Sequence, residues 1–145
     1  MPDAKILVLD ANILIRAVLG KRVRTILAQY AGITRFVAPE AAFSEVEEHL
    51  PAILAKRGLP MAESAATLLA ISKVIQRIGS DAYSAFEAKA KRRLIRRDIE
   101  DWPILATAML FDSPIWTEDA DFFGAGVATW TTDRVEMYLE NTADR

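Results

Sequence analysis

The sequence of 145 residues contains no cysteine and only one histidine, His49. The lack of cysteine excludes a disulfide framework, a thiolate zinc site and a cysteine nucleophile. The single histidine argues against a histidine-based metal site and against a Ser-His-Asp triad. Any chemistry must therefore use carboxylates, hydroxyls, amides and basic side chains.

Long apolar runs are also missing. No run reaches the length that spans a membrane, and the N-terminus lacks the basic, apolar and small-residue order of a signal peptide. We therefore expect a cytoplasmic protein without a membrane partner. Hydrophobic residues make up 52% and charged residues 26% of the sequence, which is an ordinary globular composition. The length suits a single domain over residues 1–145 with one core.

The charges are unevenly distributed, although the net charge is only −2. The run "KAKRRLIRR" at 89–97 has six cations, and "KRVR" at 21–24 has three more. Acidic residues gather at 40–48, 98–101 and 118–121, and again near the C-terminus. This segregation is compatible with an acidic pocket rimmed by basic surface.

Short apolar strands alternate with helical segments along the chain. Strands are predicted at 5–10, 34–39, 74–78, 114–116 and 128–132. Helices are predicted at 11–20, 22–31, 40–57, 61–73, 82–96, 103–110 and 133–140. The segment 74–78 could extend the helix before it, but its β-branched residues favour a strand. The alternation predicts an α/β sandwich around a mainly parallel sheet of about four to five strands. We expect Pro51 to kink its helix.

Several acids follow the predicted strands. Open parallel sheets form their sites beyond the carboxyl ends of the strands. Asp10 ends the first strand, and Glu45 lies in the helix after the second. Asp101 lies at the start of a later helix, and Asp119 and Asp121 follow the fourth strand. Four segments can therefore deliver carboxylates to one end of the sheet.

Such a group of carboxylates predicts a cation. Bringing the acids together costs roughly several kcal/mol in repulsion and desolvation unless protons or cations neutralise them. Because the chain has no cysteine and one histidine, Mg²⁺ or Mn²⁺ is the natural partner. These ions activate water and neutralise the charge that develops in phosphodiester hydrolysis.

Each acid also has a purely structural interpretation. Asp10 could close its strand while Asn12 caps the helix that follows. The acids of 98–101 lie near a helix start, where the helix dipole favours negative charge by about 0.3–1 kcal/mol. Glu118 is most simply a solvated neighbour of the ligands. Spacing alone leaves these alternatives open.

The segments "LVLDANILIRAVLG", "FSEVEEHL", "RRDIEDWPILATAML" and "IWTEDADFFGAGVATWTT" together resemble the PIN-domain ribonucleases, the family that includes VapC-type toxins. The likeness spans nearly the whole chain in the family's order. Its most telling pieces are Asp-x-Asn, Asp-x-x-Ile/Leu-x-Ala-x-Ala and Thr-x-Asp-x-Asp-Phe. The resemblance implies a three-layer α/β/α sandwich and RNA cleavage that depends on Mg²⁺ or Mn²⁺.

The resemblance also implies roles for single residues. Asn12 and Thr117 match polar positions around the metal. Glu47 and Glu48 remain alternatives to Glu45, because they lie close to it in a loose motif. The residues that match the family's acidic quartet are Asp10, Glu45, Asp101 and Asp119, and Asp121 matches an additional acid beside it.

We therefore predict an Mg²⁺- or Mn²⁺-dependent endoribonuclease, in which the acids hold the metal that activates a water. If the protein is a toxin, a small antitoxin protein and a homodimer are the expected partnerships. The basic run supplies candidate phosphate contacts, which position RNA without specifying its sequence. As an isolated feature, a cationic helix end is usually a solvated face. The candidate RNA-binding residues are Arg92, Arg93, Arg96 and Arg97.

Two rival functions use the same residues. A non-catalytic PIN-like module would hold RNA or protein without cutting. A haloacid-dehalogenase-like phosphatase would use Asp10 as its nucleophile. The second is disfavoured, because that family's opening motif has Asp where this chain has Asn12.

Overall fold

The computed structural model describes residues 4–140. Its helices and strands follow in chain order as β1 (Lys5–Leu9), α1 (Ala11–Leu19), α2 (Arg22–Tyr30), β2 (Thr34–Pro39), α3 (Glu40–Arg57), α4 (Met61–Ser72), β3 (Ile75–Ile78), α5 (Ser80–Tyr83), α6 (Glu87–Arg93), α7 (Trp102–Phe111), β4 (Ile115–Trp116), β5 (Thr129–Trp130) and α8 (Val135–Glu140). Three short 3₁₀ turns, Ser84–Phe86, Ile99–Asp101 and Ala120–Phe122, connect some of them.

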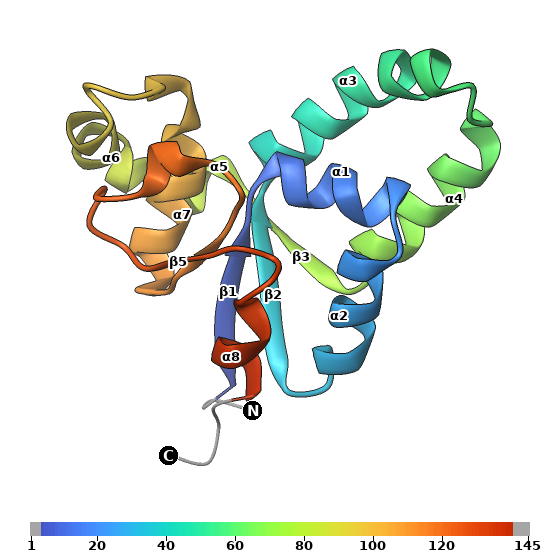
Figure 1. The fold of residues 1–145 in the computed structure, drawn as a ribbon. Coiled ribbons are helices and arrows are strands. Elements are labelled where there is room, and N and C mark those ends of the chain that lie inside the picture. Colours follow the sequence, from blue (N-terminus) through green and yellow to red (C-terminus); the bar gives the residue numbers. More distant parts are fainter. Residues whose placement is uncertain (1–3, 141–145) are drawn as a thin grey trace.

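The five strands form one sheet in the order β3-β2-β1-β4-β5, and all four pairings are parallel. Figure 1 shows α5, α6 and α7 on one side of this sheet and α1, α2 and α4 on the other. The predicted three-layer α/β/α sandwich is therefore confirmed. The strand predicted at 74–78 is also confirmed as β3, which pairs with β2.

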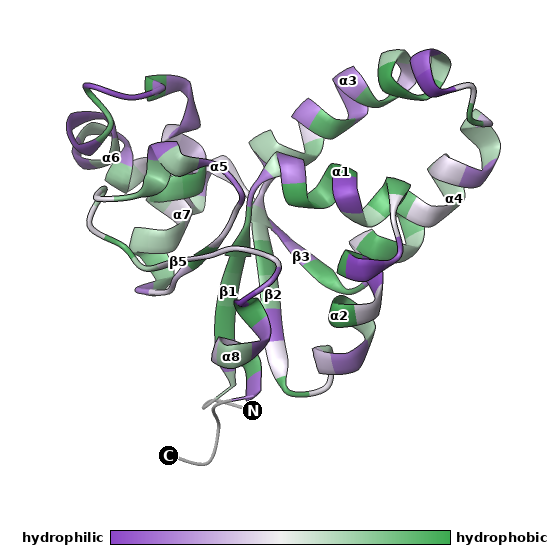
Figure 2. Cartoon of the chain, in the orientation of Figure 1, coloured by the Kyte–Doolittle hydropathy of each residue, from purple (hydrophilic) through white to green (hydrophobic). Residues whose placement is uncertain are grey.

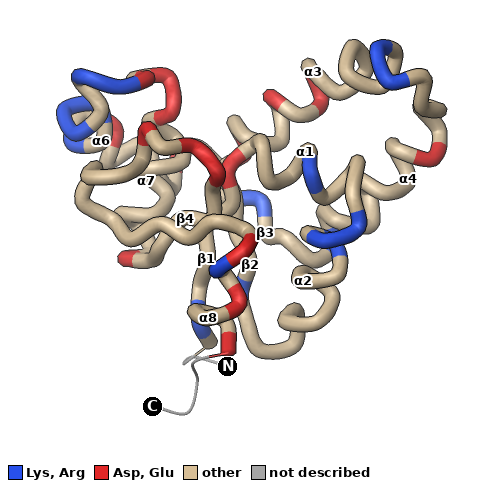
Figure 3. The backbone as a smooth tube through the Cα atoms, in the orientation of Figure 1, with Lys and Arg blue, Asp and Glu red and all other residues tan. Residues whose placement is uncertain are grey.

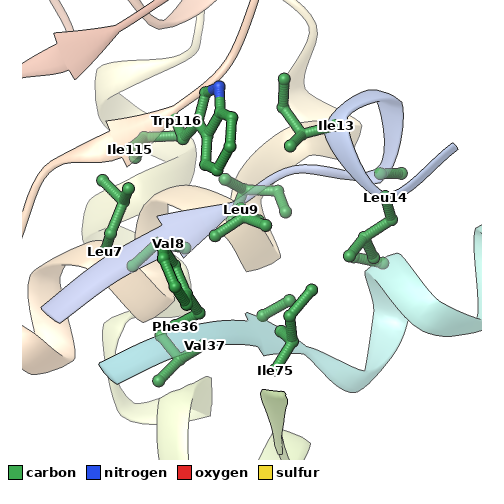
Figure 4. Packing of buried hydrophobic residues seen from close by; sticks show 14 of the residues in the cluster. Leu7, Val8, Leu9, Ile13, Leu14, Phe36, Val37, Ile75, Ile115 and Trp116 are labelled. Atoms are coloured by element: carbon green, nitrogen blue, oxygen red, sulfur yellow. The ribbon is translucent and has the colours of Figure 1, made fainter. Parts of the chain in front are cut away.

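The sheet is buried because helices cover both of its faces. Leu7, Val8 and Leu9 of β1 have no exposed surface, as expected of a central parallel strand. Figure 2 shows β1 and the helix α7 beside it as largely hydrophobic. In Figure 4 the side chains of β1 pack among those of its neighbouring strands, where the rings of Phe36 and Trp116 lie 6.4 Å apart. This core fixes the carboxyl end of β1 in place.

Helix α3 continues through Pro51 and ends at Arg57, where Gly58 adopts the left-handed conformation that stops a helix. This helix packs mainly against α1, and Pro51 lies on its exposed side. None of the helices within residues 4–140 is long and apolar enough to cross a membrane.

The single helix predicted at 82–96 is wrong. Two helices, α5 and α6, with a 3₁₀ turn between them occupy this segment, and α6 ends at Arg93. Continuing the helix would place Arg93 and Arg97 four residues apart on one face, where like charges repel. Instead, both guanidinium groups donate hydrogen bonds to backbone carbonyls of the loop 123–125. These tertiary contacts compensate for ending the helix early.

Candidate metal centre

The candidate metal centre lies where the strand order reverses. From β1 the chain proceeds to β2 on one side, whereas β4 pairs on the other side, so the carboxyl end of β1 is a switch point. In Figure 3 acidic segments from separate parts of the chain gather above this end. They line a pocket of about 50 Å³, which is room for a small cation and little more. The acids that line it are Asp10, Glu45, Glu100, Asp101 and Asp119.

Asp10 is buried at the bottom of this pocket, with 5% of its surface exposed. Its Oδ1 accepts a hydrogen bond from the backbone N–H of Ile13 at 3.0 Å and thereby caps α1. Its Oδ2 accepts a hydrogen bond from the Thr117 hydroxyl. Burial raises the pKa of Asp10 to about 6, and the nearby charges of Asp119 and Glu45 act in the same direction. The charged form of Asp10 is therefore less favourable here than in water, and a bound cation would stabilise it.

Asp10, rather than Asn12, caps the first helix. Asn12 lies one residue inside α1, is exposed, and lines the pocket. From the sequence, Asn12 is the candidate cap; in the structure Asp10 Oδ1 makes the cap, and its Oδ2 accepts the Thr117 hydroxyl beside the acidic pocket.

Three further carboxylates lie close to one another. One oxygen from each of Asp101, Asp119 and Asp121 lies within 4.8 Å of the other two. Asp101 precedes α7 and is half-buried. The pKa of Asp101 is raised to about 7. Burial is the largest cause, and the negative charges of Asp98 and Asp119 raise the pKa further. A cation bound at this group would relieve both the desolvation and the repulsion.

Thr117 connects the two parts of the centre. Its side chain has no exposed surface, and it accepts the backbone N–H of Asp119 at 2.9 Å while it donates to Asp10. Asp119 Oδ1 in turn accepts the backbone N–H of Asp121 at 2.9 Å. This chain of hydrogen bonds fixes the loop after β4 against the end of β1.

The remaining glutamates differ in their surroundings. Glu45 lines the pocket from α3. Glu47 points elsewhere and pairs with Arg77 at 3.6 Å. Glu118 Oε2 accepts the backbone N–H of Thr132 at 2.7 Å, so this residue connects the loop to the end of β5. Only Glu45 of these three therefore reaches the acidic pocket.

Two arginines of the basic run hold the same loop, a role that the sequence did not reveal. Arg93 Nη1 donates to the Ala125 carbonyl at 3.3 Å, and Arg97 Nη2 donates to the Phe123 carbonyl at 2.8 Å. A Cβ atom added to Gly126, whose φ is +95°, would lie 2.5 Å from Arg93 Nη1. We call Arg93 and Arg97 the arginine clamp. The clamp packs against the backbone of the loop that follows Asp119 and Asp121. At Gly126 this close approach leaves no room for a side chain.

The donor set of the centre suits a hard cation. The acidic side chains that converge on it offer carboxylate oxygens, to which Asn12 adds an amide oxygen. Oxygen ligands of this kind are preferred by Mg²⁺ and Mn²⁺. The residues therefore fit a divalent metal centre, and such a centre can perform metal-assisted hydrolysis.

Comparison with known proteins agrees with the observed fold. The family model described as "PIN domain" matches residues 8–140. Among solved structures, VapBC2 from Rickettsia felis, bound to a DNA fragment from its promoter, is 12% identical, with a TM-score of 0.68 over 87% of this chain and 98% of that chain. A toxin–antitoxin complex from Klebsiella pneumoniae is 22% identical, with a TM-score of 0.62 over 87% and 97%.

FitAcB from Neisseria gonorrhoeae is 20% identical to the chain, with a TM-score of 0.62 over 87% of this chain and 97% of that one. No curated protein sequence matched the chain. At these low identities, the solved structures establish the likeness of the fold and nothing finer.

Proposed function

The chain belongs to the PIN domain family, and from this premise we propose that it is an endoribonuclease that depends on Mg²⁺ or Mn²⁺. One observation carries the proposal. Asp10, Glu45, Asp101 and Asp119, from four separate segments, line one small pocket at the switch point of the sheet. Burial at this pocket, together with the repulsion between the acids, raises the pKa values of Asp10 and Asp101.

The proposed roles follow from the contacts of each residue. Asp10, Asp101 and Asp119 would bind the metal, with Asp121 beside them and Glu45 opposite on α3. Thr117 orients Asp10 and the backbone of Asp119 at once. When bound, the ion supplies an activated water and neutralises charge on the phosphate. Asp10 lies buried at the base of the site and Asp101 and Asp119 are half-buried, so their electrostatic effects are stronger than in open solvent.

The partners are proposed from the relatives. The solved structures to which the chain is similar include toxin–antitoxin complexes. We infer that this chain is the toxin of such a pair, that a small antitoxin protein inhibits it, and that it forms a homodimer. A cytoplasmic location fits this role. Arg92 and Arg96 of the basic run are exposed and remain candidate RNA contacts.

Cleavage of a mixed RNA pool tests the proposal. The purified chain should degrade RNA in Mn²⁺ or Mg²⁺ and stop in EDTA. Asp101→Asn should lower the rate by more than about a hundredfold, since changes outside the ligand shell already cost 10–100-fold. Asp112→Asn is the matched control: it lies at the other end of α7 in the left-handed conformation, which asparagine tolerates.

The outcomes separate the candidate functions. Equal cleavage by wild type and Asp101→Asn, in preparations free of contaminating nuclease, would contradict the proposal. RNA binding without metal-dependent cleavage would instead support the non-catalytic binding module. The phosphatase alternative is not retained, since the chain matches the PIN domain over residues 8–140.

A further inference from the structure

A larger groove adjoins the acidic pocket and has the opposite charge. Its volume is about 740 Å³. Its basic residues come from the α1–α2 segment and from the end of α3, and they are Arg16, Lys21, Arg22 and Arg57. We call this surface the basic groove. Its size is within the range of sites that hold small ligands of roughly 300–1,000 Å³, so it can enclose a short stretch of an extended polymer.

The basic groove is continuous with the metal centre. Asn12 and Asp119 line both the groove and the acidic pocket. A chain-like ligand that lies in the groove therefore reaches the metal centre at the shared residues.

The cations of the groove are available, whereas its acids are already engaged. Within the described chain, none of the four basic residues makes a salt bridge. The acids that line the groove, Glu118 and Asp119, accept backbone N–H groups at 2.7 and 2.9 Å. Neighbouring Arg24 donates to the Ala17 and Val18 carbonyls, which fixes α2 against the end of α1. The groove is thus a preformed surface on which positive charge predominates, although Arg22 interacts with the nearby carboxylate of Asp133.

Building on the proposed function, we propose that the basic groove binds the sugar–phosphate backbone of the RNA strand that enters the metal centre. Four cations beside a pocket of carboxylates would draw phosphates along the groove and leave the scissile one at the acids. No aromatic side chain is among the groove residues of the described chain, so base stacking is missing there. The groove therefore contributes affinity without selecting sequence.

The basic run at 89–97, which begins in α6 and continues past its end, is the less suitable phosphate surface, although it contains more charge. Arg93 and Arg97 donate to loop carbonyls in the arginine clamp. A phosphate that captured either guanidinium would compete with the contacts that hold the loop of the metal centre. This leaves Arg92 and Arg96, which do not line the acidic pocket or the basic groove.

Adjacent residues at the end of α3 provide a matched pair of variants. Arg57 lines the basic groove, whereas its neighbour Lys56 does not. Both are exposed and both lie in the last turn of the same helix, so their contributions to helix stability are similar. Binding of a labelled single-stranded RNA to the full chain is measured by anisotropy in EDTA, where cleavage cannot occur, at a series of salt concentrations.

Arg57→Ala should weaken binding and reduce the slope of log K against log salt by about 0.7, the value expected per phosphate contact of a single strand. Lys56→Ala should leave the slope unchanged. The triple variant Arg16→Ala/Lys21→Ala/Arg22→Ala should reduce the slope by about 2 on the same basis. Circular dichroism checks that each variant is folded.

Three results would overturn the proposal. Equal losses for Arg57→Ala and Lys56→Ala would indicate a general charge effect. A larger loss for Arg92→Ala/Arg96→Ala than for the triple variant would assign RNA to α6. Unchanged RNA binding by the triple variant, with lost binding of a poly-glutamate peptide, would assign the groove to an acidic protein segment.

The proposed function can fail separately. If RNA binding depends on the groove but Mn²⁺ produces no cleavage, the nuclease assignment is contradicted and the groove assignment is supported. If cleavage occurs but binding is independent of the groove, only the groove assignment is contradicted.

Discussion

The hydroxyl of Thr117 donates a hydrogen bond to Asp10 Oδ2 across 107 residues of sequence, with both side chains buried. The same hydroxyl accepts the N–H of Asp119. One small side chain therefore sets the positions of acids from two strands, and its removal should disturb the metal centre without removing any ligand.

Thr117→Val should weaken Mn²⁺ binding by about 10–100-fold, the usual effect of losing a partner that orients a ligand. It should also lower the free energy of unfolding by about 1–3 kcal/mol, because both hydrogen bonds of the hydroxyl are lost. Thr107→Val is the matched control, because Thr107 is equally buried and bonds only to the Pro103 carbonyl within α7. Calorimetric titration with Mn²⁺ measures the difference, and equal affinity in both variants would refute the orienting role.

The glutamates of α3 should behave differently from one another. Glu45→Gln should reduce Mn²⁺-dependent cleavage by about tenfold or more, because its carboxylate lines the pocket. Glu47→Gln should leave cleavage unchanged, since Glu47 faces Arg77 in an exposed pair that contributes little. Initial rates at saturating RNA and varied Mn²⁺ distinguish the two. A larger loss for Glu47→Gln would remove Glu45 from the site.

The pH dependence of stability should have an unusual sign in EDTA. Burial raises the pKa of Asp10 to about 6 and that of Asp101 to about 7, whereas both acids ionise near 3.8 when unperturbed. Between pH 4 and 7 the folded protein therefore binds more protons than the unfolded chain, so these two acids make stability fall as the pH rises. The double variant Asp10→Asn/Asp101→Asn should lose this contribution, which thermal unfolding at several pH values measures.

Mn²⁺ should reverse the trend, because it binds the ionised carboxylates. The rise in Tm that Mn²⁺ produces should be larger at pH 8 than at pH 5. The same dependence of Tm on pH in the wild type and the double variant, with and without Mn²⁺, would contradict this linkage.

Substitution of Gly126, which lies against Arg93, tests the arginine clamp. Gly126→Ala forces a Cβ atom to within 2.5 Å of Arg93 Nη1, so we expect weaker Mn²⁺ binding as well as lower stability. Gly58→Ala is the control, since it has a positive φ but open space around it, and should cost only about 1–2 kcal/mol. In the double variant Gly126→Ala/Arg93→Ala the added Cβ atom no longer meets the guanidinium, so the losses of Mn²⁺ affinity and stability should be smaller than the sum of the single losses. Strictly additive losses would show that the two residues are not coupled.

Much of the architecture could be predicted from sequence because the relevant signals are local. The apolar run that ends at Asp10 is long enough to identify a buried strand, and it became β1. The β-branched residues of 74–78 predict a strand, and β3 at Ile75–Ile78, which pairs with β2, confirms it. Each of these segments has the pattern that its buried environment requires.

The segment after Tyr83 could not be predicted in the same way. Its residues favour helix one by one, yet α6 stops at Arg93. The cause is the pair of carbonyls that Arg93 and Arg97 reach, about thirty residues further along the chain. The resemblance to a family selected the acids of the centre, but their contacts depend on tertiary packing that no spacing encodes.

The cap that Asp10 forms on α1 has a consequence for the history of such a chain. Asparagine caps helices as well as aspartate does, so Asp10→Asn exchanges the charge at the centre for an amide while the start of α1 is preserved. A folded protein without metal-dependent activity is thus one conservative substitution away. Near neutral pH, selection on stability alone would favour the amide, because burial disfavours the charged carboxylate. Only selection on the chemistry itself would retain Asp10.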